Sequence, residues 1–110
     1  MKILTRKQFL EMPAGTVYCP YDKDRVPSEL LIKANDPDTW INDFLYDDLI
    51  LPIKADNDAH QDGLWTKAEN GESVEMDFNF TGREGLFDDT MLYAVYEPKD
   101  KEALIKRLQE

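Results

Sequence analysis

The sequence is short of several residue types on which common functions depend. It has one cysteine, Cys19, and one histidine, His60, among 110 residues. A single cysteine excludes an internal disulfide and a zinc site built from several thiolates, and it is usual in a reducing compartment. The amino-terminal residues turn polar at Thr5, so no secretion signal is expected, and no apolar run approaches the roughly 20 residues of a membrane helix. We therefore expect a cytoplasmic protein without a membrane partner.

Positive charge is also scarce. The chain has 13 basic and 23 acidic residues, which gives a formal net charge of -10. Such a charge repels phosphate backbones and anionic lipid surfaces, so direct nucleic-acid binding is not expected. It favours a protein partner with a basic surface. The alternative is that the acidity only keeps a small protein soluble.

The composition is that of one folded domain. Hydrophobic residues make up 42% of the chain and charged residues 33%, which provides enough apolar side chains for one core. No linker or repeat interrupts residues 1–110. We therefore treat the chain as a single domain.

Local patterns predict short helices and strands. Thr5 and Gln8 form a capping-box pattern that starts a helix over residues 5–11, and an amphipathic helix is predicted at 99–109. A third helix is predicted over 56–69, capped by Asp56 or Asp58 and ended by Asn70-Gly71, although a hairpin at Asn70-Gly71 is the alternative. Strands are predicted over residues 16–19, 29–33, 40–53, 74–80 and 91–96, with a loop at 81–85.

The short connections between these strands favour antiparallel pairing, because parallel strands need long crossovers. We therefore predict an α+β domain with a mainly antiparallel sheet of four to five strands. The amino- and carboxy-terminal helices are expected to cover one face of that sheet.

Residues 58–69, DAHQDGLWTKAE, have the spacing of a calcium-binding loop. Asp58, Asp62, Gly63 and Glu69 fall at positions 1, 5, 6 and 12, and the segment resembles an EF-hand loop. His60 departs from the pattern at position 3, because neutral imidazole suits transition metals better than calcium. The resemblance implies a calcium or transition-metal site with ligands Asp58, His60, Asp62 and Glu69. The alternative is an ordinary helix with solvated acids.

Catalytic patterns are weak, and we expect neither an enzyme nor a cofactor. No pattern in the sequence brings Cys19 and His60 together as a nucleophile and its base, and Cys19 lies in a predicted apolar strand, where a buried thiol stays protonated. The acidic pairs 47–48 and 88–89 are adjacent residues, whose side chains point to opposite faces of a strand. Residues 82–85, GREG, are too short for a phosphate-binding P-loop.

A small-molecule or nucleotide-binding domain is the alternative function. Arg83 or Arg25 would bind a phosphate group, and aromatic side chains would stack on the ligand. The aromatic candidates are Tyr18, Tyr21, Trp40, Tyr46 and Trp65.

The segment from Leu4 to Thr16, LTRKQFLEMPAGT, resembles the start of small uncharacterised accessory proteins of tailed bacteriophages, as does DFLYDDL over residues 43–49. This resemblance implies an accessory or counter-defence factor that inhibits a host protein. It supplies no functional residues.

The leading hypothesis is therefore a non-enzymatic binding protein that occludes a protein with a basic surface. The residues proposed for the binding surface are Asp36, Asp38, Asp47, Asp48, Arg83, Asp88 and Asp89.

Overall fold

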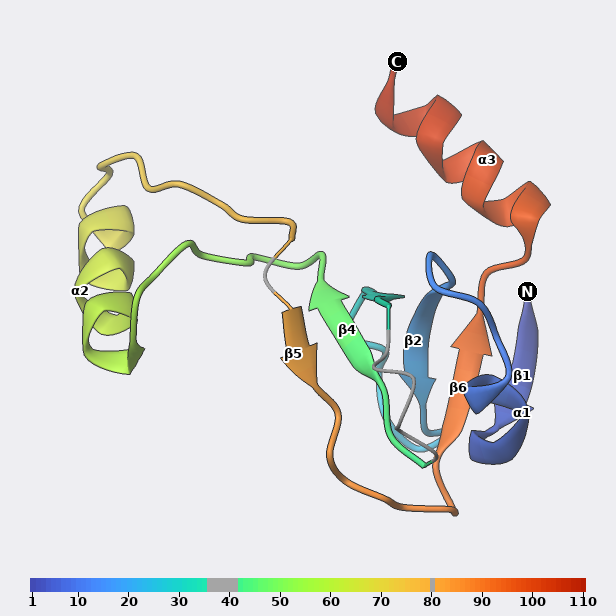
Figure 1. Ribbon diagram of the computed structural model, residues 1–110. Coiled ribbons are helices and arrows are strands. Elements are labelled where there is room, and N and C mark those ends of the chain that lie inside the picture. Colours follow the sequence, from blue (N-terminus) through green and yellow to red (C-terminus); the bar gives the residue numbers. More distant parts are fainter. Residues whose placement is uncertain (36–41, 80) are drawn as a thin grey trace.

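The computed structural model describes residues 1–35, 42–79 and 81–110, and these contain a six-stranded antiparallel sheet and three helices (Figure 1). The strands are β1 (Lys2–Thr5), β2 (Val17–Tyr21), β3 (Leu31–Lys33), β4 (Leu45–Asp48), β5 (Thr81–Arg83) and β6 (Leu92–Val95), and the helices are α1 (Arg6–Leu10), α2 (Asp58–Glu69) and α3 (Pro98–Leu108). The strand order is β1-β6-β2-β3-β4-β5. No helix within the described ranges has the length and apolar character needed to cross a membrane.

The α+β class and the antiparallel sheet agree with the prediction, but the sheet has six strands rather than four or five. Strands β2, β3 and β6 confirm three predicted segments, and β4 lies within the predicted 40–53 segment, of which residues 40–41 fall outside the described part. Strand β1 was not predicted, although it pairs with β6 along its whole length. It begins at the second residue and contains only four residues, so it lacks a recognisable alternation.

Two predictions for residues 74–85 are wrong. The described residues of the predicted strand 74–80 form only one isolated bridge, between Ile53 and Met76. The predicted loop at 81–85 instead begins with β5, which pairs with β4. Gly82 permits this pairing, because a Cβ atom there would lie 3.2 Å from the Tyr46 ring. Glycine in a strand often marks such a close approach.

The predicted capping box is confirmed at the start of α1. The Thr5 side chain accepts from the Gln8 backbone N–H, and the Gln8 side chain accepts from the Thr5 N–H. Phe9 on this helix is fully buried. The cap therefore fixes the direction in which α1 places Phe9 against the sheet.

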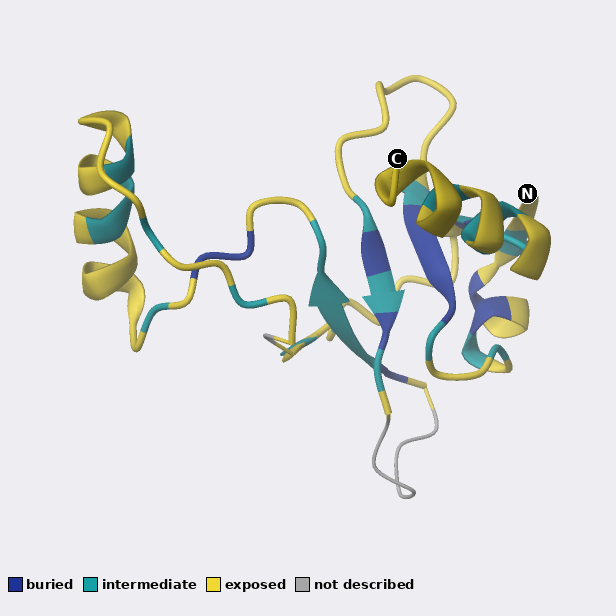
Figure 2. Ribbon diagram, turned by 90° about the horizontal axis from the view of Figure 1, so that it is seen from above, coloured by how far each residue is buried: buried dark blue, intermediate teal, exposed yellow. Residues whose placement is uncertain are grey.

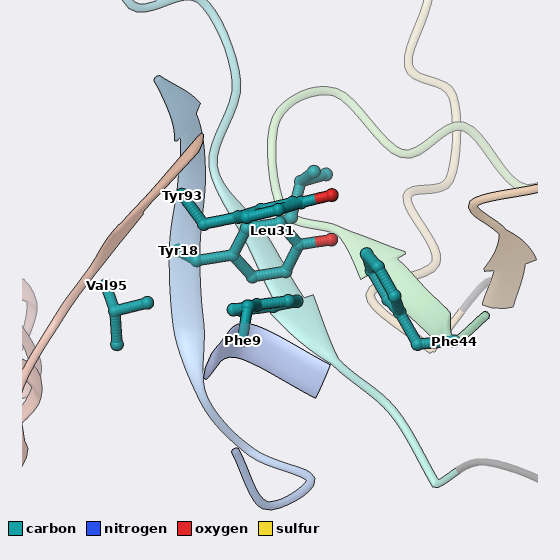
Figure 3. Packing of buried hydrophobic residues seen from close by; sticks show 6 residues of the cluster. All are labelled: Phe9, Tyr18, Leu31, Phe44, Tyr93 and Val95. Atoms are coloured by element: carbon teal, nitrogen blue, oxygen red, sulfur yellow. The ribbon is translucent and has the colours of Figure 1, made fainter. Parts of the chain in front are cut away.

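The core lies between α1 and one face of the sheet and is mostly aromatic (Figure 3). The Phe9 and Tyr93 rings stack at 4.4 Å between centroids, and Phe9 lies 4.5 Å from Tyr18 and 5.0 Å from Phe44. Leu31 and Val95 complete the buried cluster. Aromatic pairs at these distances add stabilisation beyond the area that they bury.

The prediction that both terminal helices cover the sheet is wrong for α3. No residue of α3 is buried, and Figure 2 shows a mostly exposed helix. Hydrogen bonds tie its beginning to other described residues: the Met1 amino group bonds to Glu97 and Asp100, and Lys101 Nζ donates to the Gly15 carbonyl. The helix then continues away from the sheet (Figure 1).

Candidate functional site

Charged residues and exposed apolar residues are concentrated in two regions of the structure. One is a buried ionic network where α1 meets the segments beside β4 and β5. The other is a projection between β4 and β5, which we call the arm and define as residues 49–79. The network positions the strands from which the arm extends.

Arg6 is the centre of the ionic network. It is 1% exposed, and its Nη1 donates to the Tyr93 hydroxyl at 2.9 Å. Its Nη2 donates to the Asn42 carbonyl at 2.6 Å and forms an ion pair with Glu84 at 2.9 Å. The guanidinium also lies 5.7 Å from the centre of the Phe44 ring. This one side chain therefore joins α1, β6 and the residues that flank β4 and β5.

Asp43 forms a second buried contact with the same two flanking segments. It accepts from the Arg83 side chain and from the backbone N–H groups of Gly85 and Phe44, the latter two at 2.9 Å. Burial opposes ionisation of Asp43, but these hydrogen bonds outweigh it and hold the pKa of the carboxyl below its ordinary value. The negative charge thus keeps the chain just before β4 beside the chain just after β5.

Lys33 is a third buried charge, 3% exposed, on β3. Its Nζ donates to the carbonyls of Leu10 and Met12 at 3.0 and 2.8 Å. The Leu10 carbonyl lies at the end of α1, where no later helical turn satisfies it, and Met12 follows two residues after the helix. Lys33 therefore joins the end of α1 to the sheet. These hydrogen bonds give its buried charge a structural role.

The arm is an unusually long connection. Strands β4 and β5 are antiparallel neighbours, yet 32 residues separate Asp48 from Thr81. Antiparallel neighbours are usually joined by two to five residues, and much longer connections tend to be functional. The arm holds α2 clear of the sheet (Figure 1).

Residues 52–54 and 75–77 run side by side and form what we call the stalk of the arm. The Lys54 N–H donates to the Glu75 carbonyl at 3.0 Å, and the Asp77 N–H donates to the Pro52 carbonyl at 2.7 Å. Ile53 is 5% exposed between them. These contacts are local to the arm, so it has a small packed centre of its own.

Helix α2 confirms the predicted helix at the tip of the arm, but with a different first cap. Asn57, rather than Asp56 or Asp58, is the N-cap, and its side chain accepts from the His60 N–H at 2.8 Å. At the other end the Glu72 N–H donates to the Lys67 carbonyl and Gly71 has φ +85°. This is the Schellman pattern, and it confirms Asn70-Gly71 as the stop.

The surface of the arm combines negative charge with exposed apolar groups. It has seven acidic and two basic residues, a net charge of -5 and thus half of the net charge of the chain. Four large hydrophobic side chains near its base are 40 to 59% exposed, namely Ile50, Leu51, Met76 and Phe78. None of the twelve residues of α2 is buried. Protein-binding surfaces likewise contain both apolar and polar side chains.

The proposed metal ligands do not converge. Asp58, Asp62 and Glu69 follow one face of α2, but Asp58 and Glu69 are eleven residues apart, about 16 Å along the helix axis. His60 Nδ1 instead accepts from the Asp56 N–H at 3.0 Å. The described residues contain no group of three or more side chains arranged to hold a metal ion. A continuous helix cannot wrap around a cation as an EF-hand loop does.

The acidic residues proposed for the binding surface occupy separate places. Asp47 accepts from the Thr81 hydroxyl at 2.7 Å within the sheet, and Asp48 accepts from the Ile50 N–H at 2.8 Å. Asp88 accepts from Thr90 in a turn, which lowers its pKa, and Asp89 is exposed. Arg83 is engaged with Asp43. Asp36 and Asp38 lie outside the described residues.

An open groove of about 700 Å³ lies between the 20–29 loop and the residues before β6. Arg25 and Tyr21 line it, as the ligand-binding alternative requires, but its charged lining consists of four acidic and two basic residues. Of the other aromatic candidates, Tyr18 is buried in the core, Tyr46 lies on β4, and Trp65 lies on α2. Trp40 is outside the described residues. The structure therefore does not gather the aromatic residues in one pocket.

Cys19 and His60 are also not brought together. Cys19 lies in β2, is 9% exposed and donates to the Pro20 carbonyl. His60 lies in α2 on the arm, away from the sheet (Figure 1). Cys19 therefore packs as a small apolar residue of the sheet.

The ionic network and the arm, which define this region, were not predicted from the sequence. Arg6, Asp43 and Glu84 are separated by about 40 residues each, and no local pattern links them. The arm was missed because the alternation around Phe78 predicts a half-buried strand, whereas Phe78 is 50% exposed. The cluster of acidic residues from 56 to 77 was the one signal that pointed to it.

Comparison with known protein families, curated proteins and solved structures found no similar protein.

Proposed function

We propose that this chain is a non-enzymatic binding protein whose arm docks on a basic surface of another protein. The observation that carries the proposal is that α2 and its stalk project from the sheet with half of the net charge of the chain and a base of exposed apolar residues. Because none of its residues is buried, α2 gains little stabilisation from packing within the chain. Its surface is therefore accessible to a partner.

Charge and apolar surface have different parts in the proposed binding. The charge of -5 on the arm attracts a basic surface over distance and speeds encounter. The apolar side chains at the base, among them Leu51 and Phe78, form the contacts from which water is excluded when the partner binds. Together they favour a partner whose basic patch lies beside an apolar depression.

The biological setting that we propose is inhibition by occlusion. The resemblance of residues 4–16 to bacteriophage accessory proteins suggests a host protein as the partner and the cytoplasm as the place of action. A nucleotide is a less suitable ligand, because the acidic lining of the groove opposes a phosphate group.

Capture of partners by tagged protein tests the proposal. We expect neutralisation of one face of α2, with Asp58→Asn, Asp62→Asn and Glu69→Gln, to reduce capture of a basic partner by about tenfold or more, roughly 1.4 kcal/mol. Capture should also fall between low salt and 0.5 M salt, because the Debye length becomes shorter than about 8 Å.

The matched control removes three negative charges elsewhere. Asp22→Asn, Asp24→Asn and Glu29→Gln lie in the groove, outside the arm, and should leave capture unchanged. Equal loss with both triple variants would mean that only the total charge matters. Capture that resists both salt and the α2 variant would exclude the arm as the docking element.

A further inference from the structure

The turn that ends α2 contains two residues whose side chain and backbone can react with each other. Asn70 is the C-cap of the helix and is exposed, and Gly71 follows it. This is the one Asn-Gly pair in the sequence, because every other asparagine precedes an aspartate or a phenylalanine. Glycine has no side chain, so its backbone nitrogen is uncrowded and can attack the side-chain amide of the asparagine before it.

The closed turn holds this pair in an unreactive geometry. The Gly71 N–H donates to the Ala68 carbonyl at 3.0 Å, and the next N–H along the chain donates to the Lys67 carbonyl at the same distance. Asn70 has ψ 5°, which places the Gly71 nitrogen beside the Asn70 backbone nitrogen and away from the Asn70 side chain. Ring closure needs rotation about the Asn70 Cα–C bond. The turn must therefore open before the two groups can react.

Opening of this turn costs little, because few contacts hold it. No residue of α2 is buried, and a Cβ atom built at Gly71 would meet no other atom within 4 Å. Within the described ranges, the Asn70 side chain forms no hydrogen bond, whereas the Asn57 side chain at the other end of α2 accepts from the His60 N–H. Exposed helix ends of this kind open at a free energy near zero.

We propose that Asn70 is a site of spontaneous deamidation through a cyclic imide formed with Gly71. The Gly71 nitrogen forms a bond to Asn70 Cγ, the bond from Cγ to Nδ2 breaks, and the Gly71 amide proton leaves with the amino group as ammonia. Water then adds to one of the two imide carbonyls, and the ring opens to aspartate or isoaspartate. No oxidant, reductant or enzyme takes part, in keeping with the thermal lability of asparagine.

The reaction would change the arm in one direction only. Either product adds a negative charge beside the last carbonyls of α2, where the helix dipole disfavours it, and takes the net charge of the arm from -5 to -6. Isoaspartate also routes the main chain through the side-chain carbons, which lengthens it by one atom and removes the geometry of the Schellman turn. Deamidation therefore loosens the end of α2. This inference does not depend on what the arm binds.

Peptide mapping by mass spectrometry tests the site, with the full chain kept at neutral pH and physiological temperature. We expect Asn70 to react before any other asparagine and to give isoaspartate as well as aspartate. The same chain in urea should react faster at Asn70, because the turn is then absent. Earlier reaction at another asparagine, or aspartate as the only product, would overturn the proposal.

Amide hydrogen exchange tests the role of the turn. One opening exposes the Gly71 N–H to water and frees its nitrogen for attack, so the slowing of deamidation relative to urea should match the protection of that N–H within about threefold. Gly71→Ala should speed exchange, because alanine disfavours φ +85°. It should nevertheless slow deamidation, because the added methyl group crowds the attacking nitrogen. Faster deamidation in this variant would exclude Gly71 as the nucleophile.

Discussion

At the scale of single residues, the fold depends on charges placed inside it. Arg6 and Lys33 both lie beside the aromatic core, and their donors reach carbonyl, hydroxyl and carboxylate oxygens. Burial of a charge is costly unless its hydrogen bonds are made. The contacts of Arg6 join segments far apart in the sequence, and they hold the chain before β4 and after β5 at the end of these strands opposite the arm.

Replacement of Arg6 by methionine should therefore destabilise the chain strongly. It leaves the Glu84 carboxylate buried without its cation, and we expect a loss of roughly 3–5 kcal/mol in the free energy of unfolding. Lys7→Met, at an exposed position of the same helix, should change it by less than about 0.5 kcal/mol. Urea unfolding measures both variants, and a similar small change in each would refute this role of Arg6.

The lowered pKa of Asp43 predicts a dependence of stability on pH. The folded state holds fewer protons than the unfolded state as pH falls below the ordinary value of 3.8. The contribution of Asp43 is thus complete above that value and is lost as pH falls through the lowered pKa. Asp43→Asn should reduce the free energy of unfolding at pH 7 by about 2 kcal/mol. It should also weaken the dependence of this free energy on pH below about pH 4. Unfolding at pH 2 to 7 tests this, and an unchanged slope would contradict it.

At the scale of elements, sequence patterns were reliable where local chemistry decides the outcome. The Thr5–Gln8 capping box, the Asn70-Gly71 stop and the start of α3 near Pro98 needed only neighbouring residues. The alternation over 74–80 failed because a strand requires a neighbour. That segment lies in the arm, where the described residues provide only one bridge to it.

Helix α2 provides a direct test of local stability. Gly63 lies in its interior with open space where a Cβ would be added, so Gly63→Ala should stabilise α2 by about 1 kcal/mol. Amide exchange in α2 should slow by roughly fivefold, while exchange in the sheet stays the same. Slowing throughout the sheet would mean that the arm and the sheet unfold together.

Gly71→Ala is the matched variant with the opposite sign. Gly71 has φ +85°, a conformation that costs an alanine about 1 kcal/mol. Exchange at the end of α2 should therefore become faster. An unchanged rate would show that the Schellman turn does not limit opening of the helix.

At the scale of the whole molecule, the arm makes the protein extended and its charge uneven. The radius of gyration is 15.5 Å, whereas a compact chain of 110 residues has about 13 Å. The sequence predicts the total charge, but not that half of it lies on one projection. That outcome depends on the pairing of β4 with β5 and on the buried contacts of Arg6 and Asp43.

Removal of the arm tests the central claim most directly. Replacement of residues 49–79 by Asn-Gly would join β4 to β5 through a short turn. We predict a folded chain, with the near-ultraviolet circular dichroism of the aromatic core retained, that no longer captures the salt-sensitive basic partner of the full chain. Undiminished capture of that partner by the folded, armless chain would contradict the account.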